Sequence, residues 1–193
     1  MNKRSGIETR KKILEAGMSV FSRDGTKANI REIAKTARIS TGAFYLYFRN
    51  KEELYQSLIR DRMYDLVRRT KETVMEIESP REALSAYLRV HLEYALKHKE
   101  LILLNIREQG FSLGIDEKRK YFKNQTKLIE KIVVRGIHAG EFRKCSAKEV
   151  AVIIMGTLRS IILSIAFEDF APVTARGLTE FILKGLQKTI KEE

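Results

Sequence analysis

The chain has 193 residues, 44% of them hydrophobic and 32% charged, with a formal net charge of +12. This length allows one large domain or two small ones, which can bury a core without covalent cross-links. Cys145 is the only cysteine, which excludes an intrachain disulfide framework, and nothing in the composition demands an oxidising compartment.

Basic residues are concentrated towards the N-terminal end. Residues 1–60 hold 13 Lys and Arg against 6 Asp and Glu, whereas the remaining residues hold 24 against 19. This distribution favours a polyanionic partner such as nucleic acid, although a merely solubilising surface would give the same composition.

The first stretch, residues 1–12, lacks the apolar segment of a signal peptide, so we expect a cytoplasmic protein. Ser5 and Glu8 have the spacing of a capping box, which predicts a helix over about 6–23. The basic residues around its start could contact phosphate or a minor groove, or could simply be solvated. The positions predicted to be buried are Ile13, Leu14, Gly17, Val20 and Phe21.

Two short helices separated by a tight turn are predicted over residues 29–48. Asn29 is a good N-cap residue, and after it four apolar residues follow with the spacing i, i+3, i+4 and i+7 of one helix face. Ser40 can then cap a second helix over 41–48, in which two phenylalanines four residues apart face inward. Small and aromatic residues on its other face are typical of the recognition helix of a helix-turn-helix.

The segment 9–58 carries the pattern I-R-x-I-A, followed by I-S-x-G-x-x-Y-x-Y-F-x-N-K-E-x-L. Through this pattern it resembles the DNA-binding head of TetR-type transcriptional repressors. The resemblance implies a helix-turn-helix domain over residues 1–50, formed by three helices, and an effector-binding and dimerisation domain over residues 51–193. Strand-type alternation is scarce in the rest of the chain, so an all-α fold is expected throughout.

One position departs from the family. Between the two short helices the family usually has Gly, where this chain has Arg38. The turn tends to need a positive φ, which costs a residue with a β-carbon about 1 kcal/mol. Either Arg38 bears this strain or the turn has a different geometry.

The expected DNA contacts fall into two groups. Arg31 could reach guanine O6 and N7 with two hydrogen bonds, and Ala43 could offer only a methyl group to thymine. Because the recognition face has few donors, we expect backbone contacts, DNA shape and a steep salt dependence to dominate. The base-reading candidates are Arg31, Thr41, Ala43 and Tyr47. The phosphate candidates are Asn29, Tyr45, Lys51, Thr26 and Arg38, among which Tyr45 could instead be an aromatic at the edge of the core.

The rest of the chain contains further sequence signals for the start of a helix. Asn50 and Glu53 form a capping box, and Ser79 precedes a proline and a glutamate at the favoured positions. Lys51 lies in the first turn of its helix, where the dipole also favours an anion, and in the family this lysine touches the DNA backbone. The helices predicted beyond residue 50 cover 51–76, 80–97, 100–109, 117–139, 147–168 and 174–190.

The helix at 147–168 is apolar nearly all round and approaches the length of a membrane span. Arg159 at its centre would be costly in a bilayer, so we expect a core or interface helix and no membrane. With the last helix it could form a homodimer through a four-helix bundle, the usual TetR interface, or complete an intrachain core. The interface candidates are Ile154, Leu158, Ile161, Leu178, Phe181, Ile182 and Leu186.

The resemblance also implies a small hydrophobic effector that changes the spacing of the two heads through the helix at 51–76. The sequence beyond residue 50 is similar to that of fatty acyl-CoA-responsive members of the family. The similarity lies in the stretches 106–109 and 136–142 and at Gly156. A lipophilic drug or another hydrophobic metabolite fits equally well. The candidate pocket walls, each of which could be plain core, are Met63, Leu66, Tyr87, His91, Tyr94, Phe111, Phe122 and Ile129.

No enzyme, metal or cofactor is predicted. The sequence has no P-loop, no GxGxxG and no nucleophile elbow. His91 and His98 would lie about 10 Å apart along one helix, too far for one metal ion. We therefore predict a DNA-binding transcriptional regulator, a repressor by family default, that leaves a near-palindromic double-stranded DNA operator when it binds an acyl-CoA or lipophilic compound. The alternative is a basic helical bundle that binds nucleic acid or an anionic membrane surface without specificity.

Overall fold

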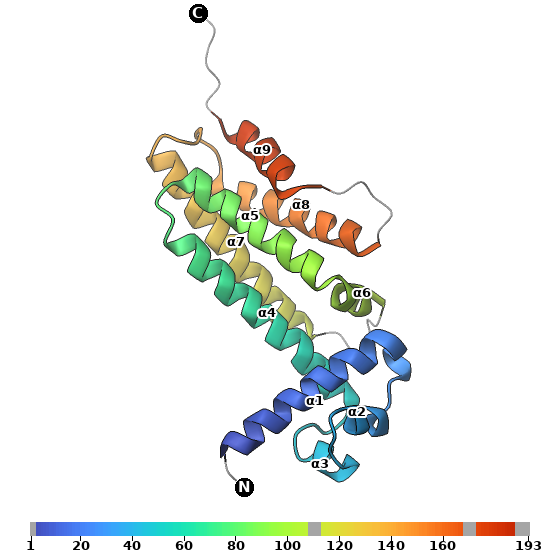
Figure 1. Cartoon of the computed structure of the whole chain (residues 1–193). Helices are drawn as coiled ribbons and strands as arrows, with labels where there is room; N and C mark the ends of the chain where they lie inside the picture. Colours follow the sequence, from blue (N-terminus) through green and yellow to red (C-terminus); the bar gives the residue numbers. More distant parts are fainter. Residues whose placement is uncertain (1–2, 108–112, 168–172, 188–193) are drawn as a thin grey trace, which may run out of the picture. The chain divides into compact units, whose positions relative to one another are not determined.

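The computed structural model describes residues 3–107, 113–167 and 173–187, and every regular element in these ranges is helical (Figure 1). The all-α prediction is therefore confirmed. The elements are α1 (Lys3–Asp24), the 3₁₀ turn η1 (Gly25–Lys27), α2 (Ile30–Thr36), α3 (Thr41–Tyr45), α4 (Lys51–Met75), α5 (Pro80–Lys97), α6 (Lys99–Arg107), α7 (Ile115–His138), α8 (Ala147–Phe167) and α9 (Ala175–Leu186).

The chain forms two compact units. The first, called the head, comprises residues 1–63 and 100–114, and the second, called the body, comprises residues 64–99 and 115–193. Helix α4 contributes residues to both. The functional division at residue 50 stays a prediction, because compactness alone does not say which residues bind DNA or effector.

An apolar core holds the head together. Phe21 of α1 meets Tyr55 of α4 edge to face, with ring centroids 5.3 Å apart, and both side chains are buried. Such a pair contributes about 0.5–1.5 kcal/mol beyond its buried area. Phe44 and Phe48 face inward, as predicted, and two leucines of α6 join the same cluster.

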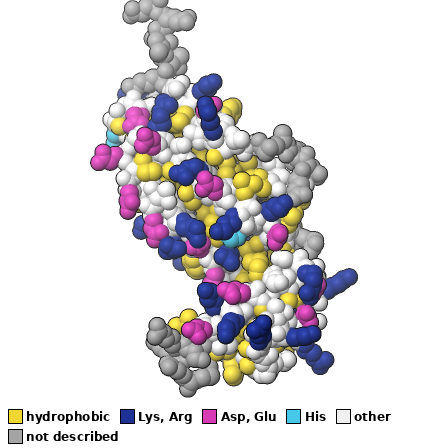
Figure 2. Space-filling model, in the orientation of Figure 1, with side chains coloured by type: hydrophobic (Ala, Val, Ile, Leu, Met, Phe, Trp, Pro, Cys, Tyr) yellow, Lys and Arg dark blue, Asp and Glu magenta, His cyan; other side chains and the backbone are white. Residues whose placement is uncertain are grey.

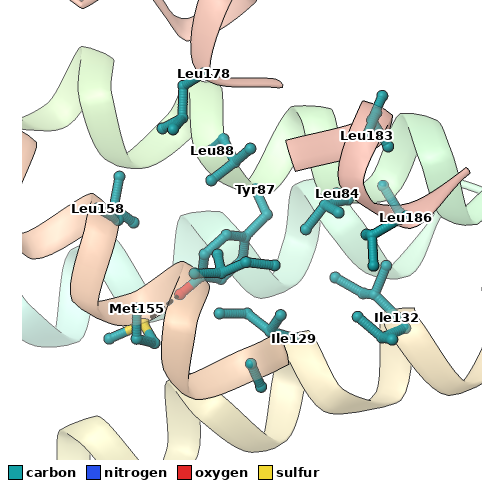
Figure 3. Close-up of a cluster of buried hydrophobic side chains, with 14 of the residues drawn as sticks. Leu84, Tyr87, Leu88, Ile129, Ile132, Met155, Leu158, Leu178, Leu183 and Leu186 are labelled. Atoms are coloured by element: carbon teal, nitrogen blue, oxygen red, sulfur yellow. Dashed lines mark hydrogen bonds between the residues drawn. The ribbon is translucent and has the colours of Figure 1, made fainter. Parts of the chain in front are cut away.

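Helix α5 is the central helix of the body, and α7, α8 and α9 all pack against it. It begins as predicted, with Pro80 in its first turn and the Ser79 hydroxyl accepting a hydrogen bond from the Glu82 amide at 3.4 Å. Figure 3 shows the core between these helices, whose aliphatic members include Leu84, Leu88, Ile129, Ile132, Leu158, Leu178, Leu183 and Leu186.

The connector between α7 and α8 fixes the start of α5. The Glu141 carboxylate accepts hydrogen bonds from the Ser79 hydroxyl and the Arg81 amide, both at 3.3 Å. An anion at this end also matches the helix dipole. From α7, the Arg135 guanidinium donates to the carbonyls of Ile77 and Glu78 just before the helix. The chain between α4 and α5 is thus held by side chains of α7 and of the connector.

The same connector explains why α9 is shorter than predicted. Instead of continuing to residue 190, α9 ends at Leu186. The Arg143 amide donates to the Leu186 carbonyl at 2.8 Å, and its guanidinium donates to the Gly185 carbonyl at 2.9 Å. These bonds satisfy carbonyls that a further turn would otherwise use.

The predicted start of α1 is wrong. The helix begins at Lys3, so Ser5 lies inside it and does not cap it. Lys and Arg are good helix formers, and a helix stabilised by its buried face extends through such residues.

The predicted end of the recognition helix is also wrong. Helix α3 ends at Tyr45 rather than at residue 48. The Leu46 amide donates to the Ala43 carbonyl at 3.3 Å and the Tyr47 amide to the Phe44 carbonyl at 2.9 Å. Such bonds between residues three apart tighten the last turn, so Tyr47 follows the helix instead of belonging to it.

Glycine at position 17 allows α1 and α4 to approach closely. A β-carbon at Gly17 would lie 2.7 Å from a methyl group of Leu54, whose side chain is fully buried. We expect Gly17→Ala to lower the free energy of unfolding by about 1–3 kcal/mol, because overpacking outweighs the gain in helix propensity. Thermal and denaturant unfolding measure this change.

The matched control is Gly6→Ala in the same helix. The nearest atom to its new β-carbon would be the Tyr47 hydroxyl oxygen, at an ordinary 3.9 Å. This variant should be neutral or more stable by up to about 1 kcal/mol. Equal effects of the two substitutions would contradict the close packing of α1 on α4.

Candidate DNA-binding and effector sites

The bend between α2 and α3 is made by Arg38, whose φ of 57° is the only positive value of a non-glycine residue in the described part of the chain. Its amide donates to the Lys35 carbonyl at 3.0 Å, and the Ile39 amide donates to the Ala34 carbonyl at 3.0 Å. These bonds close the end of α2 in the manner of a left-handed C-cap. The turn therefore has the geometry that favours Gly, and Arg38 bears the strain.

Both predicted caps of the helix-turn-helix are formed. The Asn29 side-chain oxygen accepts from the Glu32 amide at 2.9 Å, and the Ser40 hydroxyl accepts from the Ala43 amide at 3.1 Å. A cap of this kind stabilises a helix by about 1 kcal/mol. Because α2 and α3 are only one to two turns long, these caps set where each helix begins.

The predicted base-reading residues differ in how far they reach the surface. Arg31 is exposed on α2, whereas Thr41, Ala43 and Tyr47 are half-buried. Tyr47 packs against the core of the head. Leu46 was not among the predicted contacts, yet its side chain is 73% exposed beside them. The sequence could have indicated this exposure, because Leu46 does not lie on the helix face that carries the two inward-facing phenylalanines.

The predicted phosphate contacts also have structural roles of their own. The Lys51 ammonium donates to the Ala28 carbonyl at 3.1 Å, which ties the start of α4 to the loop before α2. Tyr45 is exposed and meets the Phe44 ring edge to face. Arg38 is exposed, and the side chain of Thr26 lies outside the described residues.

The predicted Asn50 cap of α4 is formed, and the Glu53 side chain bonds back to the residue before the cap. The Asn50 side-chain oxygen accepts from the Glu53 amide at 2.8 Å, and the Glu53 carboxylate accepts from the Arg49 amide at 2.7 Å. The start of this helix can therefore present backbone amides next to Lys51. On the face shown in Figure 2, Lys and Arg side chains are spread over both units and do not form one continuous patch.

A polar cluster lies within the apolar core of the body, formed by Tyr87 and His91 of α5, Gln125 of α7 and Met155 of α8. The Tyr87 hydroxyl donates to the Gln125 oxygen at 2.9 Å and lies 3.3 Å from the Met155 sulfur (Figure 3 draws the contact with Met155). The His91 ring stacks on Tyr87 with centroids 4.2 Å apart. All four side chains are buried.

Only some of the predicted pocket residues come together with this cluster. Tyr87 and His91 belong to it, and Ile129 is buried in the same core. The others are placed as follows: Tyr94 and Leu66 are half-buried in the body, Phe122 is 38% exposed on the surface of α7, Met63 belongs to the head, and Phe111 lies outside the described residues.

Sequence reasoning missed Gln125 and Met155. Gln125 occupies a position of the buried face of α7, four residues before Ile129. A polar residue at a core position of an otherwise apolar stripe was the available signal, because such a group is buried only when it has a partner.

Burial lowers the pKa of His91 from 6.5 to about 4. Loss of solvent is the main cause, and the Tyr87 carbonyl and Gln125 side chain oppose it by favouring the protonated ring. Burial also raises the pKa of the Tyr87 phenol. The cluster is therefore uncharged at neutral pH.

The predicted interface residues differ in exposure, and their part in a dimer stays a prediction. Five of them are buried within a single chain and cannot supply surface to a partner: Ile154, Leu158, Ile161, Leu178 and Leu186. Ile182 is half-buried, and Phe181 is 75% exposed. The sequence pattern indicates that α8 and α9 are apolar on two sides. It does not indicate which of these sides is covered by helices of the same chain.

Helix α8 is the one helix in the described ranges that is long and apolar enough to cross a membrane, by length and composition only. Its inner side packs in the body core. Its outer side exposes Val152, Ile153 and Arg159.

Two family models match the chain. The model described as "Bacterial regulatory proteins, tetR family" matches residues 13–58, from α1 to the first turns of α4. The model described as "Tetracyclin repressor-like, C-terminal domain" matches residues 78–163, from the start of α5 into α8.

Individual proteins agree with these models. The chain is 25% identical over 161 residues to the fatty acid metabolism regulator protein of Bacillus subtilis, covering 81% of this chain and 83% of that protein. It is 27% identical over 139 residues to the HTH-type transcriptional repressor KstR2 of Mycobacterium tuberculosis, covering 69% of both. The fold is shared with the crystal structure of FadR from Bacillus subtilis in complex with stearoyl-CoA, at a TM-score of 0.73 and 19% identity over 92% of this chain and 99% of that one.

The strain at Arg38 gives a direct prediction. Replacing it with glycine removes the β-carbon from a left-handed backbone, so Arg38→Gly should leave stability unchanged or raise it by about 1 kcal/mol. Arg38→Ala is the control, since it removes the same charge and keeps the strain. A clear drop in melting temperature for the glycine variant alone would contradict this assignment.

His91 makes the stability depend on pH. Its pKa is lower in the folded chain than in the unfolded chain, so the unfolded chain binds more protons between about pH 4 and 6.5. Stability from this residue is therefore lost as the pH falls through that window, by about 2 kcal/mol between pH 7 and 5. His91→Phe keeps an aromatic ring and should flatten the dependence by this amount in denaturant unfolding, whereas an unchanged pH slope would contradict burial of the neutral ring.

Proposed function

The chain belongs to the TetR family of bacterial regulatory proteins, and we propose from this premise that it represses transcription at a near-palindromic operator. The observation that carries the proposal is the helix-turn-helix itself. Both of its caps are formed, and the backbone at Arg38 makes the required turn. A family-model match over the same residues supports this reading.

We assign α3 to the major groove, with Arg31 at the start of α2 as the principal base-reading side chain. Arg31 is exposed, and a guanidinium can bind guanine O6 and N7 at once. Thr41 and Ala43 lie on α3, and Tyr47 follows it, with the exposed Leu46 as a further apolar contact for a thymine methyl. The start of α4, with Lys51, and the exposed Tyr45 supply phosphate contacts.

A second copy of the chain is the partner that best covers the outer faces of α8 and α9. Ile153 is 66% exposed and Phe181 is 75% exposed, although both are large apolar side chains. A β-carbon at Gly156 or Gly185 would meet no atom within 4 Å, so these positions are open and admit close approach of another helix. A two-fold dimer through these faces would present two recognition helices to successive major grooves.

The effector is proposed to be a hydrophobic small molecule that binds in the body. The relatives include a fatty acid metabolism regulator and a fold neighbour in complex with stearoyl-CoA. The apolar core of the body suits a ligand of that character. We assign the protein to the cytoplasm, where its operator lies, and assign it no catalytic role.

The experiment that tests this function is a selection of genomic fragments by the purified protein at about 150 mM salt, close to physiological ionic strength. One enriched near-palindromic sequence is expected. Uniform, salt-sensitive retention of all fragments would mean that the head binds DNA only as a polyanion, and it would overturn the operator proposal.

Arg31→Ala should weaken operator binding by about 1–3 kcal/mol and relax the sequence preference at one position in each half-site. Binding to a library of operator variants measures both effects. The control is Tyr45→Phe, which removes one hydroxyl directed at phosphate and should weaken all variants about equally. If Arg31→Ala also weakened all variants equally, its base-reading role would be wrong.

Phe181→Glu should convert the dimer into a monomer and reduce operator affinity, because it places a charge in the apolar interface. Sedimentation at micromolar concentration measures the mass. Leu96→Glu is the control, since Leu96 is 60% exposed on α5 and lies outside the proposed interface. A dimer that survives Phe181→Glu would refute this surface.

A further inference from the structure

The exposed side of α7 carries four lysines that stand three or four residues apart. They are exposed side chains, and we call them the lysine row: Lys120, Lys123, Lys127 and Lys131. At 3.6 residues per turn they fall within an arc of about 80° and span about 16 Å along the helix. Helix α7 holds seven Lys and Arg against three Asp and Glu, a net charge of +4. It therefore supplies most of the +5 carried by residues 61–193.

The lysine row faces away from the body core. The buried residues of α7 lie about 180° round the helix from the middle of the row. They are Gln125, Ile129, Ile132, Val133 and Gly136. That buried side packs against α5 and α8, whereas the proposed dimer uses the outer faces of α8 and α9. The row is therefore open to a partner of another kind.

Other helices of the body pair their exposed charges within the helix. On α4, the Arg68 guanidinium lies 2.8 Å from the Asp65 carboxylate and 3.0 Å from that of Glu72. On α9, Arg176 lies 2.8 Å from the Glu180 carboxylate. In the lysine row, by contrast, each lysine has another lysine as its neighbour on the helix face, and none of the four forms an ion pair within the described part of the chain.

This arrangement is unfavourable for the isolated helix. Like charges three or four residues apart repel each other, whereas opposite charges at the same spacing attract. A face that served only solubility would gain from charges of both signs, as on α4. A bound polyanion would remove the repulsion within the row, so the pattern favours a polyanionic partner.

The chemistry of the row fits the phosphates of duplex DNA. The lysine ammonium is a compact point charge, which binds phosphate without reading a base edge. Duplex DNA carries about one charge per 1.7 Å of its axis, so a stretch of about 16 Å presents several phosphates to the row. A helix that lies on a membrane inserts residues such as Trp, Phe or Leu beside its cations. The exposed Phe122 of α7 lies about 140° round the helix from the middle of the row.

We propose that the lysine row is a second DNA contact of this protein, which binds duplex DNA without sequence preference and is separate from the helix-turn-helix. The inference rests on the proposed function for the identity of the polyanion, since DNA is the partner assigned to the head. While the head holds DNA, other duplex is present at a high effective concentration, so a few weak phosphate contacts suffice. The row adds affinity for DNA of any sequence and leaves the sequence preference to the head.

The first test measures how binding depends on salt. The full chain is titrated with a labelled duplex of random sequence between about 50 and 200 mM salt. The row variant replaces all four lysines of the row with glutamine. The matched control loses the same charge from four exposed lysines elsewhere in the body, through Lys71→Gln, Lys97→Gln, Lys144→Gln and Lys148→Gln.

Each phosphate contact contributes about 0.9 to the slope of log K against log salt concentration. The row variant should therefore reduce the magnitude of this slope by about 2 to 4, and the control by less than about 1. Equal slopes for the two variants would mean that only the net charge matters, and the inference would be wrong.

The row variant should fold. Glutamine is a good helix former, and the substitutions remove repulsion from a solvent-exposed face. Its melting temperature should equal or exceed that of the native chain. A large drop would show that the lysines serve the fold itself, which contradicts the proposal.

Chemical acetylation locates the contact in the native chain, without any substitution. Mass spectrometry measures the acetylation rate of each lysine with and without the random duplex. The lysines of the row should be protected severalfold, while Lys71 and Lys144, which are exposed elsewhere in the body, should react as before. Unprotected lysines in the row would refute the contact. Stronger protection by phosphatidylglycerol vesicles than by duplex at the same salt would identify a membrane surface as the partner instead of DNA.

Failure of this inference and failure of the proposed function give different results. The selection of genomic fragments is repeated with the row variant, which should enrich the same near-palindrome and retain fewer other fragments. If the native chain enriches an operator but the row variant keeps the native salt slope, the lysine row is wrong and the regulator stands. If no sequence is enriched while the row variant still lowers the slope, the operator proposal is wrong and the second DNA contact stands.

Discussion

The left-handed backbone at Arg38 is the constraint on which the DNA-binding geometry depends. Helices α2 and α3 are too short to be stable alone, so their mutual direction comes from the turn, the two caps and the inward-facing phenylalanines. The turn costs about 1 kcal/mol with a β-carbon present. Each cap contributes about as much in the opposite direction, so a strained residue is tolerated where the surrounding contacts fix the conformation.

The fold was largely predictable because helix-start signals are local. Asn29, Ser40 and Asn50 each accept the expected amide hydrogen bond, since a cap needs only a side chain and a backbone group three residues away. Helix ends were less predictable. The end of α9 depends on Arg143, which is distant in sequence, and no periodicity within the helix reports that contact.

The sequence predicts more of the candidate DNA-binding site than of the candidate effector site. The positions of the proposed DNA contacts follow from one local motif, so candidates could be named from the sequence. The polar cluster of the body joins three helices, and only its α5 members were identified. Gln125 contacts Tyr87 across 38 positions of sequence, and such a pairing cannot be derived from the pattern of either helix alone. The same limit explains why the sequence did not predict that several interface candidates of α8 are buried within their own chain.

Helix α8 is apolar on nearly all sides, and this property has two possible explanations. Its apolar character matches a membrane span, yet its inner side is buried against the body core and its outer side carries Arg159 beside Val152 and Ile153. A lipid-facing helix would be penalised for an arginine near its centre, whereas a protein interface can solvate the guanidinium at its rim. A helix that packs on its own chain on one side and on a second copy on the other must be apolar on both. The hydropathy of α8 is therefore what the proposed dimer requires, and it needs no bilayer.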